Sequence, residues 1–521
     1  MSFQWTAWIP RCVAALLLFS GAVRAAAEEP ARRVTVDLRR GFQMMDNFGA
    51  SDCWSMQMLG AWSLENRERV ADLLFSREKG IGLSCWRFNL GGGKNLEDIP
   101  DPWRTAETFE VSEGVYDWTR QANEQWFLGA AKARGVRQFV AFVNSPPARM
   151  TRNGLTRCTK GLGSTNLQDG YAPQFARYLA DILEHFRNHP DPARRIDFGW
   201  VSPFNEPIWE WNGRDQEGNR AANDDIKEVV RLLDGELRRR GLPTRILAPE
   251  SGLLAAMWGE YKWMSRKYGS IYGDYLDAFC GDPEVSGALG GVVCAHSYWN
   301  DLAPLMIQTG RRRFRMQLEK YPGWRYWMTE YCVMQGADNR GGGGRDLGME
   351  TALDVARIIH YDLTLCNASA WQWWTAVSPV DFKDGLLYTD YRRPGDPESL
   401  FPSKTLWALG NFSRFIRPGA RRVGLEGADD LEGLLGSAYR SASRQELAVV
   451  LINRGMTAER VSLRVHGLPE GRTIKTFTPH VTSDVEDLAA LPPVAADGDF
   501  TVPPRSVATL VGRVAAVPDR E

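Results

Sequence analysis

The feature that most constrains the fold is an eightfold alternation of short apolar segments with helical patterns. The apolar segments are rich in β-branched and aromatic residues, which is typical of strands. Two of the intervening stretches, 171–189 and 224–241, carry apolar residues at helical spacing. Strands that alternate with helices form parallel sheets, so we predict an α/β fold with a closed (β/α)₈ barrel over residues 41–412. The predicted strands are 41–50, 84–91, 137–145, 198–206, 244–250, 291–298, 325–330 and 367–374.

The chain changes character after about Arg417. Short alternating runs such as ELAVVLINR (446–454) are separated by Gly, Pro and Asn, which is typical of an antiparallel β-sandwich. The segment VTVDLRR (34–40) is a lone strand pattern without a partner nearby in the sequence. We therefore predict a side β-sandwich domain built from residues 34–40 together with residues 418–513.

Residues 1–27 have the composition of a secretory signal peptide. Arg11 precedes an apolar run from Cys12 to about Val23, and three small residues follow at 25–27. A membrane anchor is the alternative, but the run is too short to span a bilayer well. We expect an exported protein, periplasmic or extracellular, that is free of the membrane after cleavage.

Composition restricts the partners. The formal net charge is −1, which gives no electrostatic reason to expect nucleic acid or an anionic membrane surface as a partner. The six histidines are scattered, and the seven cysteines beyond the signal form no CxxC pattern, so neither a metal nor a cofactor is expected. The 20 tryptophans suit either a large core or the flat apolar faces of sugars.

Two strand ends carry glutamates that could act together. Glu206 ends the fourth predicted strand in SPFNEP, and Glu330 ends the seventh in MTEYC. Active sites of such barrels lie at the carboxyl ends of the strands, so both side chains should face one mouth. A single glutamate at a strand end is often structural, but two facing carboxyl groups are what glycoside hydrolysis requires. We predict that Glu206 and Glu330 are catalytic.

Other strand ends supply residues that could bind a substrate. Arg87 would keep a neighbouring carboxylate ionised, unless it forms a surface ion pair. Trp371 and Trp373 share one face of the eighth strand and could stack on a sugar, or could simply pack the barrel. His296 and Tyr298 could orient a glutamate or belong to the core. The substrate-binding candidates are Asp52, Trp54, Arg87, Asn144, Asn205, His296, Tyr298, Trp371 and Trp373.

These motifs together resemble glycoside hydrolase family 30, in the clan of retaining (β/α)₈ glycosidases. The resemblance covers about residues 34–513. It implies that Glu206 is the acid/base, that Glu330 is the nucleophile and that Asn205 binds the sugar 2-hydroxyl. It also implies a side β-domain that combines N- and C-terminal strands. The motifs that carry it are RFNLGGG (87–93), NSPP (144–147), SPFNEP (202–207), QEG (216–218), AHSYW (295–299), MTEYC (328–332) and ALGNFSRFIRPGARRV (408–423).

Within the family, the chain looks closest to the endo-β-1,6-galactanase branch, with a β-linked glycan as its partner. That branch usually has Trp shortly after NSPP, where this chain has Arg149. Arg149 could serve a subsite for an acidic sugar, or lie on the outer loop in a salt bridge. A β-1,6-glucanase, glucosylceramidase-like or xylanase specificity remains open. A non-catalytic carbohydrate-binding barrel should have lost one glutamate, and both are present.

Overall fold

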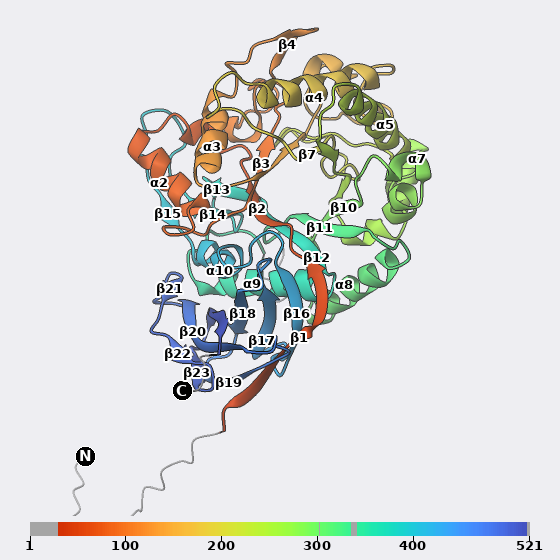
Figure 1. The fold of residues 1–521 in the computed structure, drawn as a ribbon. Coiled ribbons are helices and arrows are strands. Elements are labelled where there is room, and N and C mark those ends of the chain that lie inside the picture. The colour runs from red at the N-terminus through yellow and green to blue at the C-terminus, as the bar shows by residue number, and fades with distance from the viewer. Residues whose placement is uncertain (1–29, 302, 335–340, 518–521) are drawn as a thin grey trace, which may run out of the picture.

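The computed structural model describes residues 30–301, 303–334 and 341–517. The signal peptide predicted for residues 1–27 lies outside these ranges. The described residues form two main sheets, a ring of parallel strands and a mostly antiparallel sheet from the C-terminal region (Figure 1). None of the helices in the described ranges has the length and apolar character needed to cross a bilayer.

The parallel sheet closes on itself. Its strand order is β8-β7-β6-β3-β2-β12-β11-β10-β9, and its two end strands, β8 (Arg245–Ile246) and β9 (Pro249–Ser251), follow one another in the chain. Residues 245–251 thus join the ends of the path and occupy one of eight positions around a barrel. The eight positions match the eight predicted strands, so the predicted barrel is confirmed, with one correction: residues 41–44 of the first predicted strand belong to β1 (Arg32–Met44) of the second sheet. The other seven strands are β2 (Asn47–Ser51), β3 (Cys85–Asn89), β6 (Gln138–Phe142), β7 (Trp200–Ser202), β10 (Val292–His296), β11 (Arg325–Glu330) and β12 (Ala368–Trp373).

Helices cover the outside of the ring (Figure 1). α4 (Ala172–Arg187) shows why they form: Phe175, Leu179 and Leu183 recur at helical spacing and are buried. Basic residues in its last turn complement the helix dipole. The other helices of eight or more residues are α2 (Leu64–Phe75), α3 (Ala122–Ala133), α5 (Asn223–Arg239), α8 (Pro304–Leu318), α9 (Met349–Thr364) and α10 (Lys404–Ser413).

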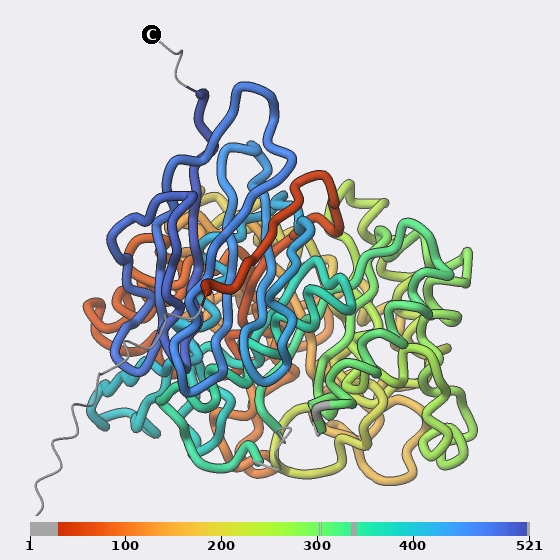
Figure 2. The backbone as a smooth tube through the Cα atoms, turned by 90° about the horizontal axis from the view of Figure 1, so that it is seen from below, coloured from red at the N-terminus to blue at the C-terminus, as the bar shows by residue number. Residues whose placement is uncertain are grey.

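The second sheet contains the N-terminal strand. β1 (Arg32–Met44) pairs antiparallel with β16 and parallel with β19, so the strand predicted at 34–40 completes the C-terminal sheet. In Figure 2 this red strand lies among the blue C-terminal strands. The sheet surrounds its own apolar core, which includes Val36, Val449 and Phe500. Its other strands are β16 (Arg421–Glu426), β17 (Leu434–Arg440), β18 (Glu446–Asn453), β19 (Glu459–His466), β20 (Arg472–Thr482), β21 (Ala489–Ala490), β22 (Val494–Ala495), β23 (Asp499–Val502) and β24 (Ser506–Ala516).

The two sheets are joined through α9 and α10, which lie between them (Figure 1). Asn411 of α10 is fully buried and links the helix to the second sheet. Its amide donates to the carbonyl of His480 and to Thr509 Oγ1, and its Oδ1 accepts from Thr482. A buried amide with all these partners fixes one orientation of the sheet against the barrel.

The interior of the barrel is apolar at one level and polar at the next. Cys85, Trp327 and Cys294 belong to a buried cluster, to which most of the strand positions around the ring contribute one or two residues. Side chains of a strand alternate between its two faces, so residues two positions further on point inward again. Cys85 is followed in this way by Arg87, and Cys294 by His296. The apolar level therefore supports a polar level at the carboxyl ends of the strands.

Candidate active site

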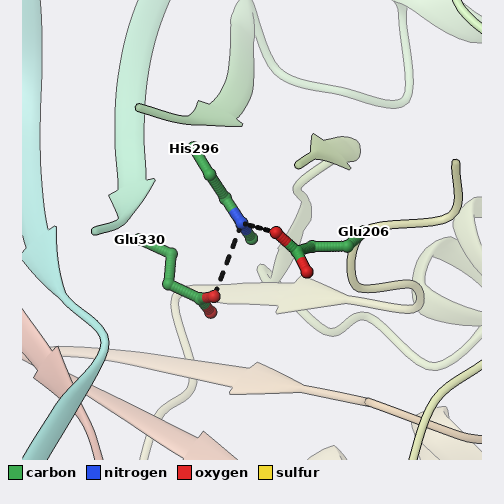
Figure 3. A group of neighbouring side chains, drawn as sticks. All are labelled: Glu206, His296 and Glu330. Carbon is green, nitrogen blue, oxygen red and sulfur yellow. Dashed lines mark hydrogen bonds and ion pairs between the residues drawn. The ribbon is translucent and has the colours of Figure 1, made fainter. Parts of the chain in front are cut away.

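Glu206 and Glu330 meet around His296 at the carboxyl ends of the barrel strands. His296 Nδ1 lies 3.0 Å from Glu206 Oε1 and 3.5 Å from Glu330 Oε1, as Figure 3 shows. One carboxylate oxygen of each glutamate and this nitrogen all lie within 4.8 Å of one another. The two glutamates, predicted from positions 124 residues apart, therefore share one site.

Glu330 is held by a cation and a phenol. Arg87, which has no exposed surface, places one guanidinium nitrogen 3.0 Å from Glu330 Oε2, and the Tyr298 hydroxyl donates to Oε1 at 3.1 Å. Burial raises the pKa of Glu330, while the positive charges of His296 and Arg87 act in the opposite direction. Arg87 is thus an internal partner of Glu330 and has no surface to offer a substrate.

Glu250, a third glutamate, lies beneath this pair and has no exposed surface. Its Oε2 lies 3.1 Å from His296 Nε2 and accepts from the Thr329 hydroxyl, and its Oε1 lies 3.7 Å from Arg87. Burial raises the pKa of a carboxyl group, but the charge of Arg87 and the hydrogen bond from His296 outweigh it. They hold the pKa of Glu250 below its usual value, so this carboxylate stays ionised.

His296 is a cation in this setting. Its two ring nitrogens face the carboxylates of Glu206 and Glu250, which accept hydrogen bonds, so both nitrogens act as donors. Burial lowers the pKa of His296, but the charge of Glu330 and the hydrogen bonds to Glu206 and Glu250 outweigh it. Together they raise the pKa to about 10.

The same three side chains have the composition of a divalent-metal site. A metal ligand must be neutral imidazole with a free lone pair. His296 offers none, because both of its nitrogens donate to carboxylates, and Arg87 already supplies positive charge to Glu330. The donor set therefore fits carboxylate chemistry and does not fit a metal ion.

A chain of amides orients Asn205 beside Glu206. The Asn205 amide donates to Asn144 Oδ1 at 3.1 Å, and the Asn144 amide donates to Asn89 Oδ1 at 2.9 Å. The backbone N–H of Asn89 in turn donates to Asp52 Oδ1 at 2.8 Å. Asn205 lines the pocket, and its Oδ1 is buried without a partner among the described residues. This oxygen is therefore an acceptor available to a hydroxyl group, while Asn144 and Asp52 act from behind it.

The glutamates open into a pocket of about 490 Å³, a size that fits a small-molecule or sugar subsite. Trp209 and Trp211 lie on the Glu206 side, where the Trp211 indole N–H donates to the Glu206 carbonyl at 2.9 Å. Tyr298 and Trp374 lie nearer Glu330. The remaining lining residues are Arg104, Asn205, Asp215, Gln216, Trp299, Cys332, Met334, Phe382 and Asp384.

Comparison with known proteins identifies the family. The family model described as "O-Glycosyl hydrolase family 30" matches residues 31–388, more than half of the chain. The chain belongs to glycoside hydrolase family 30. An endo-beta-1,6-galactanase of Hypocrea rufa is 26% identical over 440 residues, which cover 78% of each protein. The family identifies this chain as an O-glycoside hydrolase.

Solved structures agree with this family 30 fold. A conserved exported protein from Bacteroides fragilis is 30% identical, with a TM-score of 0.81 over 92% of this chain and 99% of the other. The catalytic domain of the family 30 xylanase C from Talaromyces cellulolyticus is 20% identical, with a TM-score of 0.67 over 92% and 99%. The second likeness shows the barrel and side domain alone.

Two aromatic candidates of this family 30 enzyme lie in the core and not in the pocket. Trp371 and Trp373 have no exposed surface, and their indole N–H groups bind Asp362 Oδ2 and the carbonyl of Asp384. The alternation along β12 explains this placement, because Ala370 belongs to the barrel interior and the flanking tryptophans point outward. Sequence reasoning identified the shared face correctly but not the direction in which it points. Trp374, one residue further on, lines the pocket instead.

Arg149 and Trp54 also lie away from the pocket lining of the enzyme. Arg149, the residue that departs from the family pattern, forms an ion pair with Glu110, whose Oε2 lies 3.1 Å from Arg149 Nε. The pair joins the loop after β6 to the short strand β4 (Glu110–Ser112). Trp54 is buried and packs edge-on against Trp374, with ring centroids 5.6 Å apart. It supports a pocket residue without touching the cavity itself.

Sequence reasoning missed four polar residues of the site: Glu250, Arg104, Asp384 and Asp215. Glu250 ends the fifth predicted strand, TRILAPE, and the rule that selected Glu206 and Glu330 would have found it. Arg104 ends a short 3₁₀ helix, and Asp384 and Asp215 lie outside helices and strands, so no periodic pattern indicated any of the three. Glu206 and Glu250 also share a left-handed backbone, with φ of 46° and 56°. This backbone conformation is uncommon for residues other than glycine and is found at functional sites. The sequence gives no sign of it at these two glutamates.

Proposed function

We propose that the chain is a retaining glycoside hydrolase that acts by double displacement. The observation that carries this proposal is the separation of the two carboxyl groups, with one oxygen of each within 4.8 Å of the other. Retaining enzymes place these groups about 5–5.5 Å apart, whereas inverting enzymes need roughly 6.5–9.5 Å to admit a water molecule. The spacing favours direct attack by a carboxylate.

In the first step, the Glu330 carboxylate attacks the anomeric carbon while the bond to the leaving sugar breaks. Glu206 gives its proton to the departing oxygen, so a neutral alcohol leaves and Glu330 becomes a glycosyl ester. In the second step, Glu206 takes a proton from water, and the resulting hydroxide attacks the anomeric carbon and releases Glu330. Arg87 and Tyr298 hold the nucleophile, and His296 orients both carboxylates.

For the substrate we propose a β-1,6-linked galactan. Three observations support it: the motifs around NSPP and SPFNEPIWEWN, the 26% identity with an endo-beta-1,6-galactanase, and a pocket lined by tryptophans. The aromatic lining suits the apolar faces of neutral hexoses.

We further propose that the protein works outside the cytoplasm, because residues 1–27 have signal-peptide composition. Sequencing the N-terminus of the protein recovered from outside the cytoplasm tests that point, and an intact Met1 contradicts it.

A panel of glycans tests the substrate. Purified enzyme is incubated with β-1,6-galactan, β-1,6-glucan and glucuronoxylan, and reducing ends are measured over time. We expect release from the galactan to be fastest. Faster release from the glucan or the xylan would retain the mechanism and replace the substrate. A Glu330→Ala variant provides the blank. No release above this blank from any of the three glycans would contradict all three as substrates.

Proton NMR of the first-formed product tests the mechanism. A retaining enzyme gives the β-anomer from a β-linked substrate before mutarotation mixes the anomers. An initial α-anomer would show that water attacks directly and that Glu330 is not a nucleophile. This result is independent of which glycan the enzyme prefers.

A further inference from the structure

Arg104 and Asp384 face the pocket with hydrogen-bonding capacity that the described protein does not use. Both residues line the cavity. Asp384 Oδ1 is buried and has no hydrogen-bond partner among the described residues. Arg104 makes no side-chain hydrogen bond within the described ranges, and its ion pair with Asp384 is loose, at 4.0 Å. A buried acceptor without a partner costs free energy, so its retention at the wall of a pocket indicates a ligand.

The two residues are held in place by their surroundings. Arg104 ends the short helix η1 (Pro102–Arg104), and its guanidinium lies over the Trp54 ring at 5.8 Å. Asp384 directly precedes β14 (Gly385–Tyr388), and its carbonyl accepts from the indole of Trp373. The indole of Trp103, beside Arg104, donates to the carbonyl of Arg392 in the loop after β14.

The pair lies on the Glu330 side of the pocket. Cys332, two residues after Glu330, also lines the cavity, and after burial the charge of Asp384 is the largest influence that raises the pKa of its thiol. The N–H of Trp374 donates to the carbonyl of Tyr331 at 2.9 Å, which joins the two strand ends. A nucleophile bonds to the sugar that stays on the enzyme, whereas the acid/base faces the leaving sugar. The unpaired groups therefore face the glycone sugar.

We propose that Arg104 and Asp384 form a clamp for the adjacent 3- and 4-hydroxyls of the glycone sugar. Arg104 donates hydrogen bonds to these hydroxyls, and Asp384 accepts a hydrogen bond from them. The inference rests on the proposed β-1,6-linked substrate and deepens it. In a 1,6-linked chain the 2-, 3- and 4-hydroxyls stay free, and the 2-hydroxyl faces the acceptor of Asn205. In a 1,4-linked chain the 4-oxygen belongs to the backbone and could not enter the clamp. A donor fork beside a carboxylate suits neighbouring hydroxyls, since each of them can donate and accept.

The test combines clamp variants with substrates that lack one hydroxyl. The substrates are 4-nitrophenyl β-1,6-galactobioside and its analogues without the 3- or 4-hydroxyl on the sugar next to the nitrophenol. For the wild type, we expect loss of a clamped hydroxyl to lower kcat/KM roughly 10- to 150-fold, the range for a hydrogen bond to a charged group. In Arg104→Ala or Asp384→Ala the same loss should shrink to a few-fold, because the partner is already gone.

Controls separate this inference from folding and from the proposed function. Arg392 forms an equally long ion pair with Asp101, at 4.0 Å, outside the pocket lining, so Arg392→Ala should keep the wild-type deoxygenation penalties. Arg104 is partly exposed, so Arg104→Ala carries the test if Asp384→Ala does not fold. Equal penalties in wild type and in the clamp variants overturn the clamp. If the wild type prefers another glycan, the proposed substrate fails, and the same comparison on that glycan's nitrophenyl glycoside decides the clamp separately.

Discussion

Replacing His296 should change how the stability of the protein depends on pH. The pKa of His296 is raised from 6.5 to about 10 in the folded protein, because the surrounding carboxylates outweigh the effect of burial. A raised pKa means that its contribution to stability is fully present below pH 6.5 and is lost as pH rises through the folded value. Between the two values, the folded state keeps one proton that the unfolded chain has released. The unfolding free energy should therefore fall by about 1.4 kcal/mol per pH unit.

In a window between about pH 7.5 and about pH 8.5, the difference between the wild type and a His296 variant reports this effect. Two buried acids, Glu124 and Glu217, have pKa values raised to about 7, so their contributions are lost below the window. Burial raises the pKa of the cysteines above the ordinary value of 9.0 and the pKa of Asp52 well above its usual value. These groups lower the unfolding free energy in the wild type and in the variant alike, so they cancel in the comparison. Three other histidines have lowered pKa values and are neutral in both states throughout the window: His185, His360 and His480.

The assay is urea unfolding of wild type and His296→Gln at the two ends of the window. The wild type should lose about 1.4 kcal/mol more unfolding free energy than the variant from one end to the other. His189→Gln serves as the control, because His189 is exposed and lies away from the site, so it should keep the wild-type slope. A flat wild-type profile, or an equal slope in His296→Gln, would falsify the idea that this imidazole is a cation held by the carboxylates.

Three further predictions concern activity. Glu206→Ala should lower turnover of natural substrate roughly 10²–10⁴-fold but keep glycosylation by activated aryl glycosides and respond to azide, whereas Glu330→Ala should lose nearly all activity and give an azide product of opposite anomeric configuration. An identical azide response of the two variants would contradict these roles. Trp374→Ala should raise KM about tenfold through lost apolar contact, while Trp371→Phe, which loses a hydrogen bond to Asp362 outside the pocket, should cost about 1 kcal/mol of unfolding free energy and leave KM unchanged. Arg149→Ala should lower the unfolding free energy by roughly 1–3 kcal/mol, because its buried partner loses its ion pair, with the preference between neutral and glucuronate-capped galacto-oligosaccharides unchanged. A shifted preference in kcat/KM would show that Arg149 reads the sugar.

The sequence by itself determined the barrel and the position of its chemistry. Eight strand patterns in alternation with helices leave few architectures, and the strand-end rule places Glu206 and Glu330 in one mouth. The same rule applied to TRILAPE places Glu250 there as well. These conclusions depend only on local periodicity and on the common direction of parallel strands, and both are written in the chain.

Only the tertiary structure decided which way a buried strand faces and which loops meet. Both faces of β12 are buried and each carries a polar residue, so its sequence does not show whether Trp371 or Ala370 points into the barrel. The ion pair between Arg149 and Glu110 and the approach of Arg104 to Asp384 join segments far apart in the chain. Such contacts are set by how loops cross the mouth of a closed ring. Local patterns carry no information about that geometry, because loops have no period and their partners depend on the whole barrel.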